Sequence, residues 1–306
     1  MGWTMEGAEN HRHAARWLRG LGLEPTALEL VHDRPWSRVL RVASADGDLY
    51  LKQCAPVQAF EVALTVELTA RWPDRMPEVV AADPGRAWLL LRDGGLRLRD
   101  GGTLEPFARA LELYGELQLG EAAHADELLA LGLPDVRLPV LAATYGAFVD
   151  ADHGLALDEA ARLRALAPRF NELCEELAGF GLPASIQHDD LHDANVYVRE
   201  GQVAIFDWGD SSVSHPFFSW LKPLGVAKHY GVDPDRLSAA YLRPWTAVAP
   251  AERLREALRV AVPVGSFAYV RQYQRQLDFM PPEARREYEA YKLEQLRRLL
   301  ARLAAA

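Results

Sequence analysis

The sequence predicts an α+β protein in two parts, a small antiparallel sheet in residues 1–93 and a mostly helical part in residues 94–306. The predicted elements are short and mixed before residues 93–103, and long and mostly helical after them. Within the second part, two short apolar runs flank a turn, which indicates a hairpin directly after a helix. The Asp-Gly-Gly segment at 93–95 is expected to link the two parts.

The first part is expected to contain two helices and five strands. Residues 8–19 have a helical pattern that ends at Gly20, and residues 59–72 form the second helix. The pair Asp46-Gly47 favours a tight hairpin turn between two of the strands. The five strands are expected at 27–31, 37–43, 48–53, 77–81 and 87–92.

The second part is expected to be built from long helices. Helical periodicity covers residues 104–118 and 157–180, and two further helices are predicted at about 251–277 and 282–303. Pro263 lies inside the third of these helices. Because proline has no backbone N–H, we expect a kink or a break there.

A hairpin in the second part carries the most informative pattern of the chain. Strands at 196–198 and 203–206 are expected to flank a turn in which Gly201 tolerates a positive φ. If the turn centres on Gly201 and the residue before it, Asn195 faces the end of the second strand and lies beside Asp207. Two oxygen donors are then expected to point to one place.

The residues around this hairpin have the spacing that kinase-type phosphoryl transfer uses. His188-x-Asp190-x4-Asn195 precedes the hairpin, and Asp207 follows it. Asp190 would accept a proton from a substrate hydroxyl, while Asn195 and Asp207 are of the ligand types that Mg²⁺ prefers. The first pattern alone is weak evidence, but the strand-end aspartate at hairpin distance makes the combination strong.

Lys52 at the end of an apolar strand is the second chemical feature. Strand alternation places it on the same face as Tyr50. Such a lysine is more often a surface residue, but kinases use a strand lysine to bind phosphates and a helix glutamate to hold it. Glu61 lies on the apolar stripe of the next helix, whereas Glu67 is spaced to pair with Arg71 in solvent. Glu61 is therefore the predicted partner of Lys52.

Two common phosphate-binding loops are missing from the sequence. It contains neither Gly-x-Gly-x-x-Gly nor Gly-x4-Gly-Lys-Ser/Thr. Residues 33–37 between the first two strands could offer backbone amides and the Ser37 hydroxyl instead. A plain strand connection explains Ser37 equally well.

With these residues in place, the chain resembles the aminoglycoside phosphotransferase and choline kinase-like family of small-molecule kinases, which have a protein-kinase-like two-lobe fold. The resemblance extends from about residue 35 to residue 220, and the C-terminal helices fit the helical lobe of the family. The matching segments are Leu51-Lys52, Glu61 in its helix, 77–80, 88–95, His188 to Asn195, Ile205 to Asp210, and His215-Pro216.

The resemblance implies roles for individual residues. Asp190 would be the catalytic base, and Asn195 and Asp207 would bind Mg²⁺. Together with Ser37, the residues expected to bind ATP or to hold its ligands are Lys52, Glu61, Leu91, Arg92 and Gly94. Tyr269 and Tyr273 lie where the family often builds its acceptor pocket. Asp210 is a candidate for a second metal or a cationic substrate, and equally for a solvated acid or a helix cap.

The motif departs from the common family pattern at two places. Asp189 stands where glycine is usual, and Asp193-Ala194 stands where Pro-Gly is frequent. An inward-pointing Asp189 would raise the pKa of Asp190, since like charges disfavour joint ionisation. We favour a structural role, in which Asp189 points away or caps a turn. His188 and His192 are likewise interpreted as residues that hold the loop.

The composition of the chain disfavours some classes of binding partner. A formal net charge of -9 disfavours a general nucleic-acid binder; it would suit a cationic small-molecule acceptor, although solubility explains it better. No signal peptide and no apolar run long enough for a membrane are present. Cys54 and Cys174, far apart in apolar surroundings, are expected to be buried thiols in a reducing compartment, which favours the cytoplasm. The oligomeric state is left open.

Two other functions stay open. A metal-dependent hydrolase could use the cluster His188, Asp189, Asp190, His192 and Asp193. That hypothesis would leave Lys52 and Glu61 unexplained. A nucleotide-binding protein without turnover is the other alternative, which the intact Asp190, Asn195 and Asp207 oppose. A protein kinase is disfavoured because no Ala-Pro-Glu segment follows the hairpin.

Overall fold

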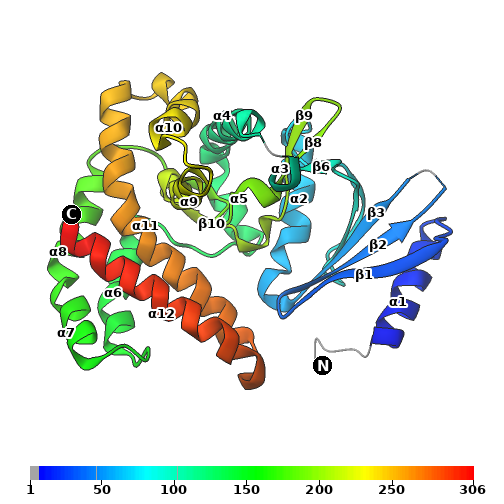
Figure 1. Cartoon of the computed structure of the whole chain (residues 1–306), viewed down its shortest axis with the longest axis horizontal. Helices are drawn as coiled ribbons and strands as arrows, with labels where there is room; N and C mark the ends of the chain where they lie inside the picture. Colours follow the sequence, from blue (N-terminus) through cyan, green and yellow to red (C-terminus); the bar gives the residue numbers. More distant parts are fainter. Residues whose placement is uncertain (1–6, 46, 102) are drawn as a thin grey trace. The chain divides into compact units, whose positions relative to one another are not determined.

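The computed structural model describes residues 7–45, 47–101 and 103–306, which form two compact units (Figure 1). The first unit runs to Leu96 and includes Tyr197–Gly209, and the second comprises Arg97–Val196 and Asp210–Ala306. The predicted boundary after residue 93 falls near the end of the first segment. The prediction placed the hairpin in the second part, whereas residues 197–209 belong to the first unit. That the two parts have separate functions stays a prediction.

A five-stranded antiparallel sheet dominates the first unit, in the order β1-β2-β3-β5-β4. The predicted strands are found with ends shifted by up to three residues, and Asp46 in the expected turn lies outside the described residues. The strands are β1 (Ala27–Arg34), β2 (Ser37–Ala43), β3 (Leu49–Cys54), β4 (Val79–Asp83) and β5 (Trp88–Arg92).

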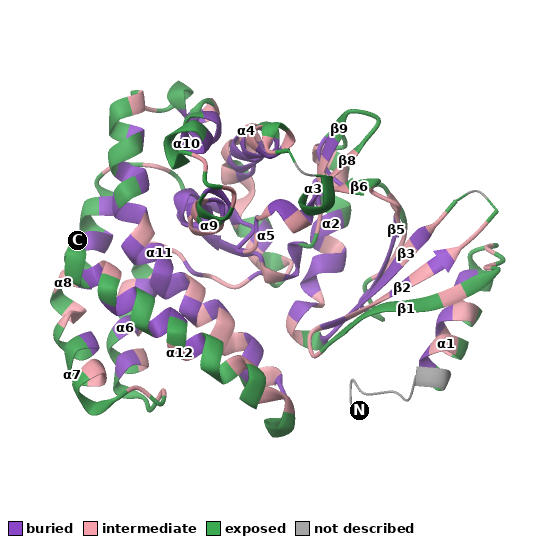
Figure 2. Ribbon diagram, viewed as in Figure 1, coloured by how far each residue is buried: buried purple, intermediate pink, exposed green. Residues whose placement is uncertain are grey.

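Both faces of the central strands are buried, because a helix covers each of them. On one face, Leu18 of α1 (Gly7–Gly20) joins Leu51 of β3 and Leu90 of β5 in one apolar cluster. On the other face, Val62 of α2 (Phe60–Arg71) packs with Leu89 of β5 and its neighbours. β1, at the sheet edge, is largely exposed, whereas β3 and β5 are largely buried (Figure 2). The period-two alternation of β3 therefore turns every second side chain toward α2.

A second, three-stranded sheet contains the site hairpin. It has the order β6-β8-β9, with β6 at Leu96–Arg97, β8 at Val196–Arg199 and β9 at Gln202–Ile205. Glu200 and Gly201 have φ values of 53° and 80°. Positive φ at both central residues is the requirement of the tight hairpin turn that matches strand twist. The predicted turn centre is confirmed.

The second unit is mostly helical, as predicted. Its strands β7 (Ser185–Gln187) and β10 (Ser212–Ser214) pair antiparallel, and β7 ends directly before His188. Its helices are α3 (Leu98–Gly101), α4 (Glu105–Glu121), α5 (Ala125–Ala130), α6 (Leu138–Asp150), α7 (Leu157–Ala165), α8 (Ala167–Ala178), α9 (Leu221–Tyr230), α10 (Pro234–Leu242), α11 (Ala251–Phe279) and α12 (Pro282–Ala305).

Buried aromatic rings join the helices of the second unit. Tyr145 of α6 stacks on Phe170 of α8 with ring centroids 4.2 Å apart, and both rings meet Phe267 of α11 edge-on. All three are almost fully buried. Such pairs add to the free energy of burial itself, so α11 is anchored at its middle by this cluster.

Two prolines affect the helices differently. The single helical pattern predicted for residues 157–180 is in fact two helices separated at Leu166, because Pro168 cannot donate a backbone hydrogen bond and is tolerated only at the start of α8. Pro263 lies inside α11 without ending it. Figure 1 shows α11 changing direction along its length, as expected for an internal proline.

Two glycine variants test the packing of the helical unit. An added Cβ at Gly265 of α11 would lie 2.8 Å from Phe218 Cδ1 and 3.1 Å from its Cβ, so the ring cannot simply swing away. We expect Gly265→Ala to lower the free energy of unfolding by about 1 kcal/mol or more.

The matched control is Gly146→Ala in α6, where an added Cβ meets nothing within 4 Å. It should raise the free energy of unfolding by roughly 0.5–1 kcal/mol, because alanine loses less backbone entropy on folding. Urea denaturation measures both variants, and a stabilised Gly265→Ala protein would contradict the packing described for α11.

Candidate active site

The predicted site residues lie in both units, and each half is described by itself. In the first unit, Lys52 Nζ lies 2.7 Å from Glu61 Oε1 and also donates to Asp207 Oδ1. Lys52 and Glu61 are almost fully buried. Glu67 pairs instead with Arg71 at 3.3 Å on the surface. The predicted choice of Glu61 over Glu67 is confirmed.

The buried ammonium is charged. Burial alone would lower the pKa of Lys52, but the carboxylates of Asp207 and Glu61 raise it well above its usual value. Burial also raises the pKa of Glu61, against the opposing effect of Lys52. The side chain of Asp207 is 51% exposed. The first unit therefore presents a fixed positive charge beside an accessible carboxylate.

The backbone after β9 is tightly constrained. Asp207 has a φ of 65°, a left-handed conformation that is uncommon for residues other than glycine. Two residues later, a Cβ on Gly209 would lie 2.7 Å from Glu61 Oε2. Strained conformations of this kind cost of order 1–3 kcal/mol and tend to occur at functional positions.

The expected adenine-binding segment packs on the hairpin. A Cβ on Gly94 would lie 2.6 Å from the ring of Phe206 and 3.0 Å from Tyr197, so only glycine fits there. Leu91 is buried in β5, and Arg92 pairs with Glu78 at 2.8 Å. Ser37 is buried at the start of β2.

In the second unit, the side chain of Asp190 is held by three groups. Lys222 Nζ lies 2.6 Å from its Oδ1, while His192 Nε2 and Asn195 Nδ2 lie 3.3 Å and 3.2 Å from its Oδ2. Burial alone would raise the pKa of Asp190, but the charge of Lys222 and the contact with His192 hold it well below its usual range. Asp190 is therefore an ionised carboxylate.

Two histidines shape the loop that carries Asp190. His188 Nδ1 accepts a hydrogen bond from the backbone N–H of Asp190 at 3.3 Å, and His192 Nδ1 accepts one from Ala194 at 3.1 Å. His188 is fully buried. Both histidines make loop contacts of the kind that a structural role requires, and His192 additionally reaches Asp190.

Asp189 also has a structural role. Its carboxylate accepts hydrogen bonds of 2.7 Å from Gln187 Nε2 and from Ser212 Oγ. Burial raises its pKa to about 7, although these hydrogen bonds act in the opposite direction. Its φ of 62° lies in the region that favours glycine, which aspartate tolerates better than most residues. Aspartate therefore fits a backbone conformation that glycine would adopt without strain.

The residues predicted to bind the phosphate acceptor make two separate sets of contacts, one of the two tyrosines and one of Asp210. Tyr269 accepts a hydrogen bond from Lys222 Nζ at 2.9 Å, and its hydroxyl lies 3.0 Å from that of Tyr291. Tyr273 packs against Tyr291 with ring centroids 4.9 Å apart. Asp210, by contrast, accepts a hydrogen bond from Gln276. Tyr269 is thus connected to Asp190 through Lys222.

A cavity of about 410 Å³ in the second unit borders this network. Its titratable lining residues are Arg99, His192, Asp193, Lys222 and His229. Another cavity, of about 560 Å³, lies among α9, α10 and α11, and its lining includes none of the predicted site residues.

Lys222 is the residue that sequence reasoning missed. Lys222 lies far from Asp190 along the chain. A single lysine in an apolar segment forms no sequence pattern that would link it to that residue. Only the packing of α9 against the loop that carries Asp190 brings the two together.

The donor atoms suit Mg²⁺. Asn195 Nδ2 faces Asp190, donating to its backbone oxygen at 3.0 Å, which makes Oδ1 the amide atom left to act as a ligand. Asp207 offers a half-exposed carboxylate. Few protein oxygens, completed by phosphate and water, are typical of magnesium sites. Within the described residues, no group of three or more His, Cys, Asp or Glu side chains could hold a metal ion by itself.

The model of the phosphotransferase enzyme family matches residues 2–218, and the chain belongs to this family. The match confirms the resemblance to the small-molecule kinases of the aminoglycoside phosphotransferase and choline kinase type. With it, the prediction that the protein is a kinase-type enzyme is confirmed. No curated protein matches the chain significantly.

Solved structures confirm the predicted α+β, protein-kinase-like fold. A choline/ethanolamine kinase family protein from Mesorhizobium loti has a TM-score of 0.63 at 18% identity and covers 98% of this chain and 99% of its own. The GDP complex of aminoglycoside 2'-phosphotransferase-IIIa has a TM-score of 0.64 at 14% identity, with coverages of 95% and 98%. Choline kinase LicA from Streptococcus pneumoniae has a TM-score of 0.65 at 10% identity, with coverages of 96% and 99%.

Replacing Glu61 with glutamine tests the buried ion pair. Glu61→Gln should lower the free energy of unfolding by about 2 kcal/mol, because a buried ammonium loses one of its two carboxylate partners. Glu67→Gln on the same helix should change it by less than about 0.5 kcal/mol, since its pair with Arg71 is exposed. Equal effects in urea denaturation would mean that the pair of Lys52 and Glu61 is not formed.

The raised pKa of Asp189 predicts a pH-dependent stability. The native state retains this proton up to about pH 7, whereas an unfolded aspartate loses it near pH 4, so the contribution of Asp189 to stability falls as the pH rises between these values. The stability of the wild type relative to Asp189→Asn should therefore drop by roughly 2–4 kcal/mol from pH 4 to pH 7.

Unfolding free energies measured across this range test the prediction. The control is Asp126→Asn, because the side chain of Asp126 is 95% exposed. Its difference from the wild type should stay constant with pH. A relative stability of Asp189 that rises with pH would show that the carboxylate is ionised in the native state.

Proposed function

We propose that the protein transfers the γ-phosphoryl group of ATP to a hydroxyl of a small molecule, with Asp190 as the catalytic base. The ionised Asp190, fixed by Lys222, His192 and Asn195, is the observation that carries this proposal. It stands in a chain of the phosphotransferase enzyme family. Proteins of similar fold include an aminoglycoside phosphotransferase and a choline kinase, which are named for small-molecule substrates.

The first unit would bind the donor. Lys52 would contact the ATP phosphates, and Glu61 would keep the lysine in position. Leu91, Arg92 and Gly94 would offer their backbone to adenine. Ser37 is proposed as an additional phosphate contact. Because one structure of similar fold is a GDP complex, GTP should be tested beside ATP as a donor.

Magnesium would be held by oxygen atoms of Asn195 and Asp207. When bound, the ion would offset the negative charge of the phosphates. The chain itself contributes the positioning of these oxygens: Asp190 orients the amide of Asn195, and Lys52 binds one oxygen of Asp207.

The second unit would activate the acceptor. A carboxylate with a lowered pKa is a weak base, so Asp190 would mainly orient the hydroxyl and take its proton late. This suits phosphoryl transfer, whose loose transition state depends on positioning and electrostatics. Tyr269 and Tyr273 are the proposed walls of the acceptor site, with Asp210 as a further contact.

The hydrolase hypothesis is not favoured. Its candidate ligands are occupied by other partners: Asp189 by Gln187 and Ser212, and Asp193 by Arg99 at 2.7 Å. The other alternative, nucleotide binding without turnover, gives no reason for an ionised Asp190 anchored by three groups.

The cytoplasm is the proposed location, because ATP is abundant there and both cysteines are free, buried thiols. In the described part of the chain, no helix is both long enough and apolar enough to cross a bilayer.

Asp190→Asn tests the proposed function. The amide keeps the size of the side chain but cannot take a proton, so turnover with Mg²⁺ and ATP should fall by about 10²–10⁴-fold while ATP binding is retained. Asp207→Ala should likewise abolish turnover with the fold intact. ADP release in the presence of an acceptor panel measures the rates, and calorimetry measures nucleotide binding.

The control is Asp126→Asn, an exposed aspartate whose exchange should leave the rate unchanged. Substantial ATP-dependent phosphorylation by Asp190→Asn or by Asp207→Ala would remove the basis for the assignment.

A further inference from the structure

The ammonium group of Lys222 lies next to Asp190, the carboxylate proposed to orient the acceptor hydroxyl. Lys222 Nζ lies 2.6 Å from Asp190 Oδ1, and the side chain of Lys222 is only 22% exposed. Burial alone would lower its pKa, but Asp190 raises it well above the usual value, so the ammonium is charged. The nitrogen also lies 4.6 Å from the centre of the Tyr269 ring and donates to its hydroxyl.

Lys222 retains capacity for a ligand. An ammonium has three N–H donors, and among the described residues Asp190 and Tyr269 accept from two of them. Lys222 also lines the cavity of about 410 Å³ described above, as does His192. Asp190 is not itself a lining residue, but Lys222 and His192 both contact its carboxylate, so a ligand of Lys222 in this cavity would lie one side chain away from the proposed base.

The charged residues of the cavity lining are two cations and one carboxylate. Arg99 and Lys222 carry positive charge, and His192 and His229 add two imidazoles. Asp193 is the acidic lining residue, and it already binds Arg99 at 2.7 Å and the hydroxyl of Tyr230 at 2.9 Å. Asp190 is engaged by Lys222 in the same way. An amine entering the cavity would therefore meet carboxylates that already have cationic partners.

We propose that the acceptor carries an anionic group, a carboxylate or a phosphate monoester, which binds Lys222 while the hydroxyl of the same molecule is directed to Asp190. This inference rests on the proposed function and specifies its substrate class. A cationic acceptor, which the acidic net charge of the chain would suit, is disfavoured because its ammonium would lie beside that of Lys222 and like charges repel strongly in a half-buried site.

Matched probes test the proposal. Gluconate, glucose and glucosamine share a carbon skeleton and differ in charge, as do glycerate, glycerol and serinol. Calorimetry without nucleotide gives their affinities, and ADP release with Mg²⁺ and ATP gives kcat and KM. We expect at least tenfold tighter binding of the anionic member of a set than of its amine, and the same order in kcat/KM.

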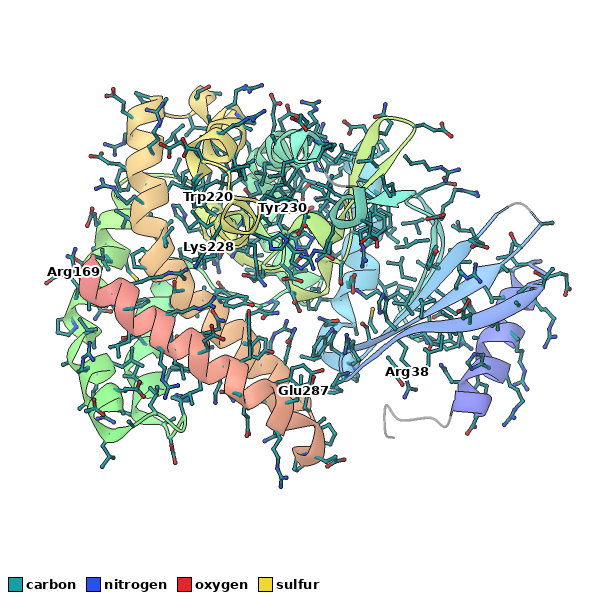
Figure 3. All side chains as sticks on the ribbon, viewed as in Figure 1. Arg38, Arg169, Trp220, Lys228, Tyr230 and Glu287 are labelled. Carbon is teal, nitrogen blue, oxygen red and sulfur yellow. The ribbon has the colours of Figure 1, made fainter. Side chains whose placement is uncertain are left out.

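Substitutions on α9 test whether Lys222 causes the preference for anionic probes. Lys222→Gln should weaken binding of the anionic probe at least tenfold and change that of the neutral probe much less, whereas Lys222→Arg should keep the preference. Lys228→Gln is the matched control, since Lys228, which is labelled in Figure 3, is exposed on the same helix. Circular dichroism confirms that each variant is folded.

Several outcomes overturn the proposal. They are amines bound as tightly as anions, no measurable binding of the anionic probes, and an anion preference that survives Lys222→Gln. An equal loss for all three charge types would leave Lys222 only the role of positioning Asp190. Because binding is measured without ATP, these results are distinct from failure of the proposed function, which would appear as absent ADP release despite anion binding.

Discussion

The burial of both faces of β3 is the constraint on which the donor half of the site depends. With α1 on one face and α2 on the other, a lysine in this strand is almost fully buried. It remains charged only because two carboxylates lie next to it. Glu61 comes from α2, and Asp207 comes from a hairpin far along the chain, so the lysine fixes the place of both. In the first unit, the buried position of Lys52 and the positions of its two carboxylate partners therefore depend on each other.

The second unit stabilises the opposite charge, the partly buried carboxylate of Asp190. Asp190 is stabilised by Lys222 and by two side chains of its own loop. The loop in turn is fixed by hydrogen bonds from backbone N–H groups to His188 and His192. This network leaves the carboxylate no freedom to rotate away, which is what a reaction governed by positioning requires. The same network determines which charges an incoming molecule would meet.

Much of this could be predicted from the sequence, and the failures have physical causes. The turn at Gly201 and the pair of Lys52 with Glu61 follow from local rules of chain conformation and helix periodicity, so they were predictable. Lys222 was not, because its contact with Asp190 depends on how α9 packs. The break at Leu166 was missed since the apolar periodicity continues through Pro168.

The left-handed backbone at Asp189 separates two properties of this loop, its path and its attachment to the neighbouring strands. A conformation that glycine adopts without strain is present here with an aspartate, whose carboxylate adds bonds to β7 and β10. The path of the chain is thus encoded by the loop and not by the side chain at this position. The side chain at position 189 therefore adds hydrogen bonds to two strands without setting the path that places Asp190.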